Sequence, residues 1–90
     1  MKLSIRRTTQ FKRDIKRVLQ SGKDIEKLLS IVEELAEGWK LPPEYHNHSL
    51  SGKDKNKRDC HIEPDWILLY AIEDDEFVLY RTGSHSQLFR

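Results

Sequence analysis

Histidine and aspartate gather in one part of this chain. Asp59, His61 and Asp65 fall within seven residues, and another histidine, His85, follows twenty residues later. Histidine has an ordinary pKa of about 6.5, so two histidines can supply one base and one acid at neutral pH. Cleavage of RNA without a metal needs these two roles, because one group takes a proton from the ribose 2′-OH as it attacks the adjacent phosphate and another protonates the leaving 5′-oxygen. A cation such as Arg81 can stabilise the charge that grows on the phosphate.

The strand that would carry His61 is visible in the hydrophobic pattern. From residue 58 the pattern has period 2, so alternate side chains face opposite sides of a strand. One face carries Arg58, Cys60 and Ile62, and the other carries Asp59, His61 and Glu63. Cys60 is therefore expected to be a buried, inert thiol. Residues 66–72 are apolar at both odd and even positions, which predicts a central strand covered on both faces.

Turns join these strands into an antiparallel meander. Pro64 is pre-set for a turn at 63–66, an acidic turn follows at 73–76, and residues 77–82 form a last strand before Gly83.

Hairpin reversal then places the first turn and the segment after Gly83 at the same end of the sheet. His85 is therefore expected near Asp65, with His61, Asp59 and Arg81 close to that end. His48 joins them if residues 48–50 fold back over the same surface, which the spacing alone does not decide.

Two amphipathic helices precede the meander. Residues 3–6 alternate as a short strand, and Thr8 or Thr9 can cap a helix that ends at Ser21-Gly22. Its apolar stripe consists of Phe11, Ile15, Val18 and Leu19. Asp24 caps a second helix.

Residues 38–57 are typical of a loop, and 84–89 of a tail or a single helical turn. The order β-α-α-β-β-β predicts the class α+β, with an N-terminal helical hairpin packed on a small, mainly antiparallel sheet.

Length and charge limit the possible functions. The 90 residues predict one domain, 1–90, and no apolar run approaches the ~20 residues of a membrane helix. With no signal peptide and a single cysteine, we expect a cytoplasmic protein. The net charge of +1 hides a basic block at 1–30, a second one at 47–58 that includes Lys53 and Arg58, and an acidic block at 59–79. Basic blocks suggest a phosphate-rich partner, although they can also simply solvate the helices.

Each candidate side chain also has a purely structural explanation. His48, His61 and His85 can be solvated side chains, Asp65 can be a turn former, and Arg81 can be a solubilising residue on an edge strand. Phe89 can fix the C-terminus to the core or stack on a base.

Three motifs in order resemble one protein family. The segments are HSLSG at 48–52, RDCHIEPDWILLY at 58–70 and RTGSHSQLF at 81–89. They resemble the YafQ-type toxins of the RelE/ParE superfamily, which are small bacterial toxins of type II toxin–antitoxin modules, and the resemblance covers nearly the whole chain. It implies an endoribonuclease that needs no cofactor and cuts mRNA on the ribosome. It also implies a cognate antitoxin as partner, and operator DNA bound through the antitoxin complex.

The resemblance also implies roles for individual residues. The matching positions are His48, Asp59, His61, Asp65, His85 and Phe89. His85 would be the general acid, while His48 and His61, with Asp65, would be the base and the phosphate-positioning group in an order that stays open. Phe89 would orient the RNA. Independently of the resemblance, the positive charges of Lys53, Arg58 and Arg81 are expected to support RNA binding. The family often has proline where this chain has Ser49.

Two other functions stay open from the sequence. A ParE-like toxin would inhibit DNA gyrase through protein contacts and would not need the histidines. A metal nuclease would use His46, His48, His61 and Asp59, although the chain has no zinc-type spacing.

Overall fold

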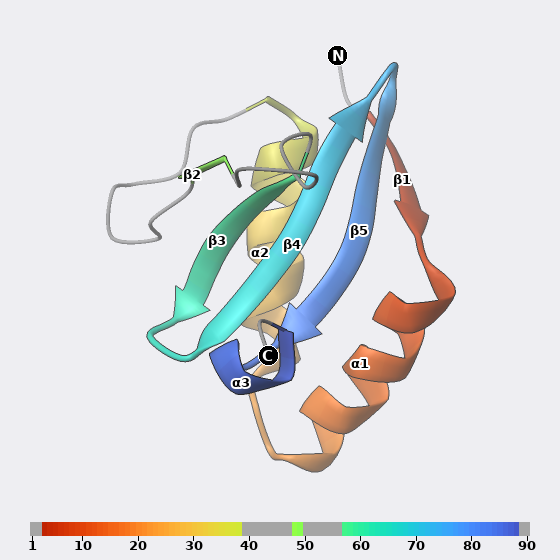
Figure 1. The fold of residues 1–90 in the computed structure, drawn as a ribbon. Helices are drawn as coiled ribbons and strands as arrows, with labels where there is room; N and C mark the ends of the chain where they lie inside the picture. Colours follow the sequence, from red (N-terminus) through yellow and green to blue (C-terminus); the bar gives the residue numbers. More distant parts are fainter. Residues whose placement is uncertain (1–2, 39–47, 50–56, 89–90) are drawn as a thin grey trace.

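A computed structural model describes residues 3–38, 48–49 and 57–88 and confirms the predicted α+β class. In chain order the elements are β1 (Ser4–Arg7), α1 (Thr9–Gln20), α2 (Ile25–Ala36), β2 (His48–Ser49), β3 (Arg58–Glu63), β4 (Trp66–Glu73), β5 (Glu76–Gly83) and α3 (His85–Leu88). The strands form one five-stranded sheet in the order β1-β5-β4-β3-β2 (Figure 1). The predicted central strand is therefore β4.

The meander is antiparallel as predicted, since β4 pairs antiparallel with both β3 and β5. The first strand differs, because β1 pairs parallel with β5 at the sheet edge. Its partner lies some 70 residues further along the chain, so no local pattern could have indicated this pairing.

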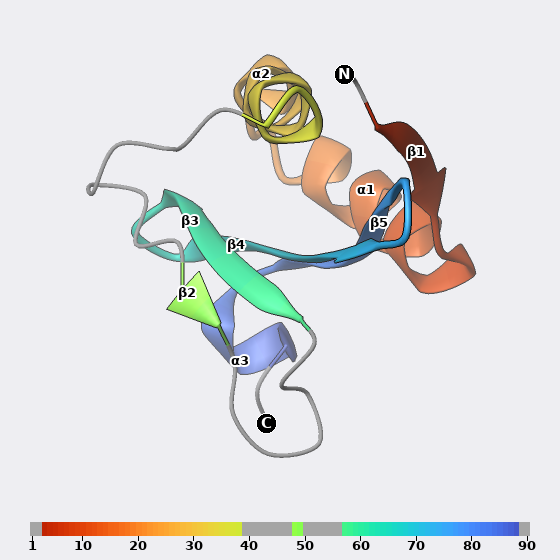
Figure 2. The ribbon, with the colours of Figure 1, turned by 90° about the horizontal axis from the view of Figure 1, so that it is seen from above.

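Helices cover the two faces of the sheet unequally. Seen from above, α1 and α2 lie on one side of the sheet and α3 lies on the other (Figure 2). The Thr8 hydroxyl accepts from the Phe11 N–H and starts α1, and the Asp24 carboxylate accepts from the Glu26 N–H and starts α2. Between them Gly22 takes a φ of +81°. The predicted helical hairpin and its caps are confirmed.

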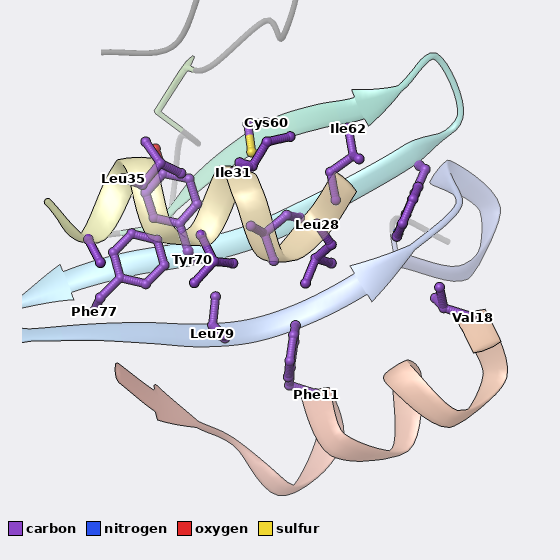
Figure 3. Close-up of a cluster of buried hydrophobic side chains, with 14 residues drawn as sticks. Phe11, Val18, Leu28, Ile31, Leu35, Cys60, Ile62, Tyr70, Phe77 and Leu79 are labelled. Carbon is purple, nitrogen blue, oxygen red and sulfur yellow. The ribbon is translucent and has the colours of Figure 1, made fainter. Parts of the chain in front are cut away.

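The hydrophobic core fills the space between the helices and the sheet (Figure 3). Leu28, Ile31 and Leu35 of α2 face Cys60 and other buried side chains of the sheet, and each large apolar side chain buried in this way contributes about 1.5–3 kcal/mol. Tyr70 and Phe77 stack with their ring centroids 5.0 Å apart. Burial, with the nearby Asp59 charge, raises the pKa of the Cys60 thiol to about 12, so this thiol is inert.

Alternation along β3 breaks at its end. The register shifts between His61 and Glu63, and Glu63 pairs with the buried Trp66. Its carboxylate lies 3.0 Å from Lys27 Nζ of α2. The expectation that Glu63 shares a face with His61 is therefore wrong, because the β-bulge turns it to the helix side.

Candidate active site

The two described histidine rings lie together on the sheet face opposite α1 and α2. We call this the α3 face; Asp59 and His61 of β3 lie on it, because Cys60 and Ile62 between and beside them belong to the core. The rings of His61 and His85 are 5.3 Å apart between centroids and meet edge-to-face at 69°. The predicted convergence of His61 and His85 at one end of the sheet is therefore observed.

Local hydrogen bonds explain why the chain turns to present His85. The Ser84 N–H donates to Gln87 Oε1 at 2.9 Å, and the Gln87 N–H donates back to Ser84 Oγ at 3.3 Å. This reciprocal pair is a capping box, which fixes the first turn of α3. Gly83 precedes it with a φ of +156°, a backbone conformation that other residues rarely adopt.

Asp65 holds His85 from the β3–β4 turn. Its Oδ1 accepts from the His85 backbone N–H at 3.0 Å and lies 3.5 Å from His85 Nδ1. The backbone hydrogen bond lowers the pKa of the Asp65 carboxyl below its ordinary value, and the His85 side chain adds to this. Asp65 therefore stays ionised at neutral pH and can orient the imidazole.

The sheet register places the remaining candidates in a second row. His48 lies opposite Asp59, Asp59 opposite Leu69, and Leu69 opposite Arg81, across β2, β3, β4 and β5. Asp59 is buried, at 4% exposed. The row that contains His61, which pairs with Ile67, lies two residues further along the strands and is the next row on the same face. The register therefore places Asp59 and the backbones of His48 and Arg81 one such row away from His61.

Arg81 has a partner that the sequence reasoning missed. Its guanidinium binds the buried carboxylate of Asp14 on α1 through Nε and Nη2, both at 3.0 Å. The signal was an acid inside an apolar stripe, since Asp14 lies between Phe11 and Val18 on the buried face of α1.

A second missed contact lies on the α3 face. Lys57 Nζ sits 4.7 Å from the centroid of the Tyr80 ring, whose hydroxyl bonds to Glu73. Lys57, Asp59 and His61 are spaced two residues apart, so strand alternation could have predicted that Lys57 lies on the same face as the other two.

Arg58 is not brought to the histidines. Arg58 pairs with Tyr70, which belongs to the core on the helix side, so strand alternation takes it away from the α3 face. Lys53 and Phe89 lie outside the described residues.

Among the side chains that the structure describes, no group of three or more His, Cys, Asp or Glu is placed to hold a metal ion. His46, from the metal-nuclease alternative, lies outside them. No helix within the described ranges is long and apolar enough to cross a membrane.

Fold and site together define a small α+β domain with acid–base groups on one sheet face. A family model described as bacterial toxin of type II toxin–antitoxin system, YafQ, matches residues 3–90. The mRNA interferase toxin YafQ of Escherichia coli K12 is 40% identical over 81 residues, which are 89% of this chain and 88% of that one. This chain belongs to the YafQ family of type II toxins.

Solved structures agree with this assignment. The E. coli DinJ–YafQ toxin–antitoxin complex matches with a TM-score of 0.92 at 36% identity and covers 100% of both chains. A copper-bound mutant toxin from Helicobacter pylori matches with a TM-score of 0.93 at 39% identity and covers 97% of this chain and 99% of that one. The sequence-based recognition of the family is confirmed.

Proposed function

We propose that this protein is an mRNA interferase, an endoribonuclease that cuts mRNA on the ribosome by acid–base chemistry without a metal. The observation that carries the proposal is the pair of imidazoles whose centroids lie 5.3 Å apart on the α3 face, with Asp65 bound to the backbone N–H of His85 and 3.5 Å from its Nδ1. The E. coli relative is named an mRNA interferase, which supports the same reaction.

In the proposed reaction His85 is the general acid that protonates the leaving 5′-oxygen. His61 or His48 removes the proton from the 2′-OH, which attacks the adjacent phosphorus, so that the P–O5′ bond breaks and a 2′,3′-cyclic phosphate forms. The two imidazoles exchange their protonation states in the step. Arg81 stabilises the charge on the phosphoryl oxygens. Phe89 and Lys53 support the RNA.

An antitoxin is the proposed protein partner. The E. coli relative forms a complex with DinJ. In this chain a groove of about 400 Å³ lies between β1, α1 and α2, and Ile5 and Leu29 line it while 41% and 53% exposed. An amphipathic antitoxin segment would cover such apolar surface. We also propose that the complex binds operator DNA and that the toxin acts in the cytoplasm, where mRNA and ribosomes are.

The main test is primer extension on translated mRNA with purified His85→Ala. We expect cleavage to fall by about 10²- to 10⁴-fold, while Ser86→Ala in the same turn cleaves like the wild type. Full cleavage by His85→Ala would refute the assigned role. Loss of cleavage when transition metals are removed by a chelator, with Mg²⁺ kept to preserve the ribosomes, would refute the metal-free mechanism. Inhibition of gyrase supercoiling without RNA cleavage would replace the proposal with a ParE-like function.

The antitoxin surface can be tested separately. Leu29→Glu places a charge in the groove and should weaken neutralisation by the antitoxin encoded beside this gene, without changing cleavage by the toxin alone. Exposed Glu34→Lys, on the same helix and outside the groove lining, is the control. Neutralisation of Leu29→Glu at wild-type antitoxin concentrations would exclude this groove as the binding surface.

A further inference from the structure

Asp14 is a fully buried carboxylate, at 0% exposed, on the inner side of α1. Its Oδ2 accepts from Arg81 Nε at 3.0 Å and from the Thr82 backbone N–H at 3.2 Å. Its Oδ1 accepts from Arg81 Nη2 at 3.0 Å and from Gln10 Nε2 at 3.1 Å. A buried charge is tolerated only when it is paired in this way, so Asp14 specifies one relative arrangement of α1 and β5.

The charge state of the pair is fixed at neutral pH. Burial raises the pKa of Asp14, but hydrogen bonds from Arg81, Gln10 and Thr82 together bring it below its ordinary value. The same pairing raises the pKa of Arg81. Asp14 is thus an anion and Arg81 a cation.

The carboxylate lies where β5 loses its parallel partner β1 while it remains paired with β4. The register of β1 with β5 ends at Leu79, and the chain then turns into α1. The Thr8 N–H donates to the Leu79 carbonyl, and its hydroxyl donates to the Tyr80 carbonyl. Asp14 then accepts the Thr82 N–H. Helix α1 therefore takes over the hydrogen bonding of this strand edge.

The geometry of the ion pair leaves Arg81 able to bind a second anion. A guanidinium has five N–H donors in a rigid fork, and Asp14 takes two of them from the Nε–Nη2 side. The other three belong to the Nη1–Nη2 end, which matches two phosphoryl oxygens. The Arg81 side chain is 31% exposed, so this end can meet a ligand.

We infer that Asp14 is a positioning residue for RNA cleavage, which holds the Arg81 guanidinium so that its remaining donors meet the scissile phosphate. It also fixes Thr82 near the end of β5, three residues before His85. This inference rests on the proposed function, because it assigns Asp14 to the reaction proposed there.

A double-mutant cycle tests the inference. Single-turnover cleavage of ribosome-bound mRNA is measured for the wild type, Asp14→Asn, Arg81→Ala and the double variant. We expect Asp14→Asn to lower the cleavage rate constant about tenfold when Arg81 is present, and by less than about twofold when residue 81 is alanine. In that background no guanidinium is left to position, and the asparagine oxygen can still accept the Thr82 N–H. Gln10→Ala is the matched control, because it removes one bond to Asp14 and leaves both bonds to Arg81; it should cleave like the wild type.

Three results would overturn the inference. A purely structural role would give equal losses for Asp14→Asn in both backgrounds, and no role would give wild-type cleavage. If circular dichroism shows that Asp14→Asn is unfolded, Arg81→Lys decides, because lysine keeps the charge and lacks the two-point contact; wild-type cleavage by that variant overturns the inference. Absence of cleavage by the wild type itself would instead refute the proposed function.

Discussion

At the scale of single residues, an aspartate in a turn controls a histidine in the next helix. Asp65 accepts a hydrogen bond from the His85 backbone and lies beside Nδ1 of the same residue. One carboxylate therefore sets both the position of the residue and the orientation of its ring. If His85 is the general acid proposed above, its ring is aligned before the substrate arrives, which is how positioned general acids gain their effect.

Replacing Asp65 should separate these two contributions. Asp65→Asn keeps an oxygen that can accept the His85 N–H but loses the charge, whereas Asp65→Ala loses both. We expect both variants to lose part of the about 10²- to 10⁴-fold that a positioned general acid contributes, with alanine the worse. The check is single-turnover cleavage against pH, with Asp74→Asn in the β4–β5 turn as control. Unchanged pH profiles for both variants would contradict the role of Asp65.

Sequence reasoning reached some of these residues and missed others for a physical reason. His61, Asp65 and His85 could be brought together because strand alternation and hairpin reversal depend on neighbouring residues only. The pairing of Asp14 with Arg81 spans 67 residues and depends on the parallel register of β1 with β5, which no local pattern contains. An acid inside an apolar stripe indicated that a partner exists, but not which one.

At the scale of elements, the junction between β5 and α3 places His85. A Cβ at Gly83 would lie 2.6 Å from Gln87 Oε1, which accepts the Ser84 N–H in the capping box. The positive φ at Gly83 adds backbone strain for any larger residue. The start of α3 therefore needs glycine before it.

Gly83→Ala should disturb the site through this junction. We expect a destabilisation of about 1–3 kcal/mol from the strained backbone and a large loss of cleavage, because Gln87 must leave the capping box and α3 shifts with His85. Gly22→Ala is the matched control: its φ is also positive, but nothing lies within 4 Å of an added Cβ. Urea unfolding and cleavage are measured together. Equal cleavage by the two variants would show that the junction does not position His85.

Among the secondary-structure elements, the limits of the two long helices were predicted correctly from the sequence. Thr8, Asp24 and Gly22 mark helix ends by local hydrogen bonds and backbone conformation, so the helix limits agree with expectation. The face of Glu63 was mispredicted, because a β-bulge shifts the register and nothing in the alternating pattern announces it.

At the scale of the whole molecule, acid should weaken the attachment of α1 to the sheet. The folded pKa of Asp14 lies below its ordinary value, so its contribution to stability is present above the unfolded value of about 3.9 and is lost as pH falls through the folded value. The unfolding free energy of the wild type should therefore fall more between pH 6 and pH 3 than that of Asp14→Asn, which has no carboxyl to titrate.

Glu63→Gln provides the comparison for this acid titration. Its pKa is also lowered, chiefly by Lys27, but the ion pair is exposed to solvent and screened. This variant should follow the wild-type pH dependence closely. Urea denaturation at a series of pH values measures all three proteins, and identical slopes for the wild type and Asp14→Asn would contradict the account of Asp14.

The candidate active site lies open on the protein surface, and this bears on how an RNA substrate would be oriented. The His85 and Asp65 side chains are 55% and 72% exposed, and the nearby groove lined by Asp65, Gly83 and Arg17 holds only about 200 Å³. We expect this open surface, as far as the structure describes it, to leave a flexible RNA strand poorly aligned for attack by the 2′-OH. Orientation accounts for a large part of many catalysed reactions, and here the ribosome would have to supply it.

Cleavage should therefore depend strongly on presentation of the mRNA. We expect the protein to cut an mRNA on programmed ribosomes about 10³-fold or more faster than the same free RNA, because only the former is pre-oriented. Single-turnover primer extension on both substrates, with His85→Ala as the inactive control, measures the ratio. Equal rates on the two substrates would mean that the domain orients RNA alone, and the positioning role would then pass from the ribosome to Arg81 and the α3 face.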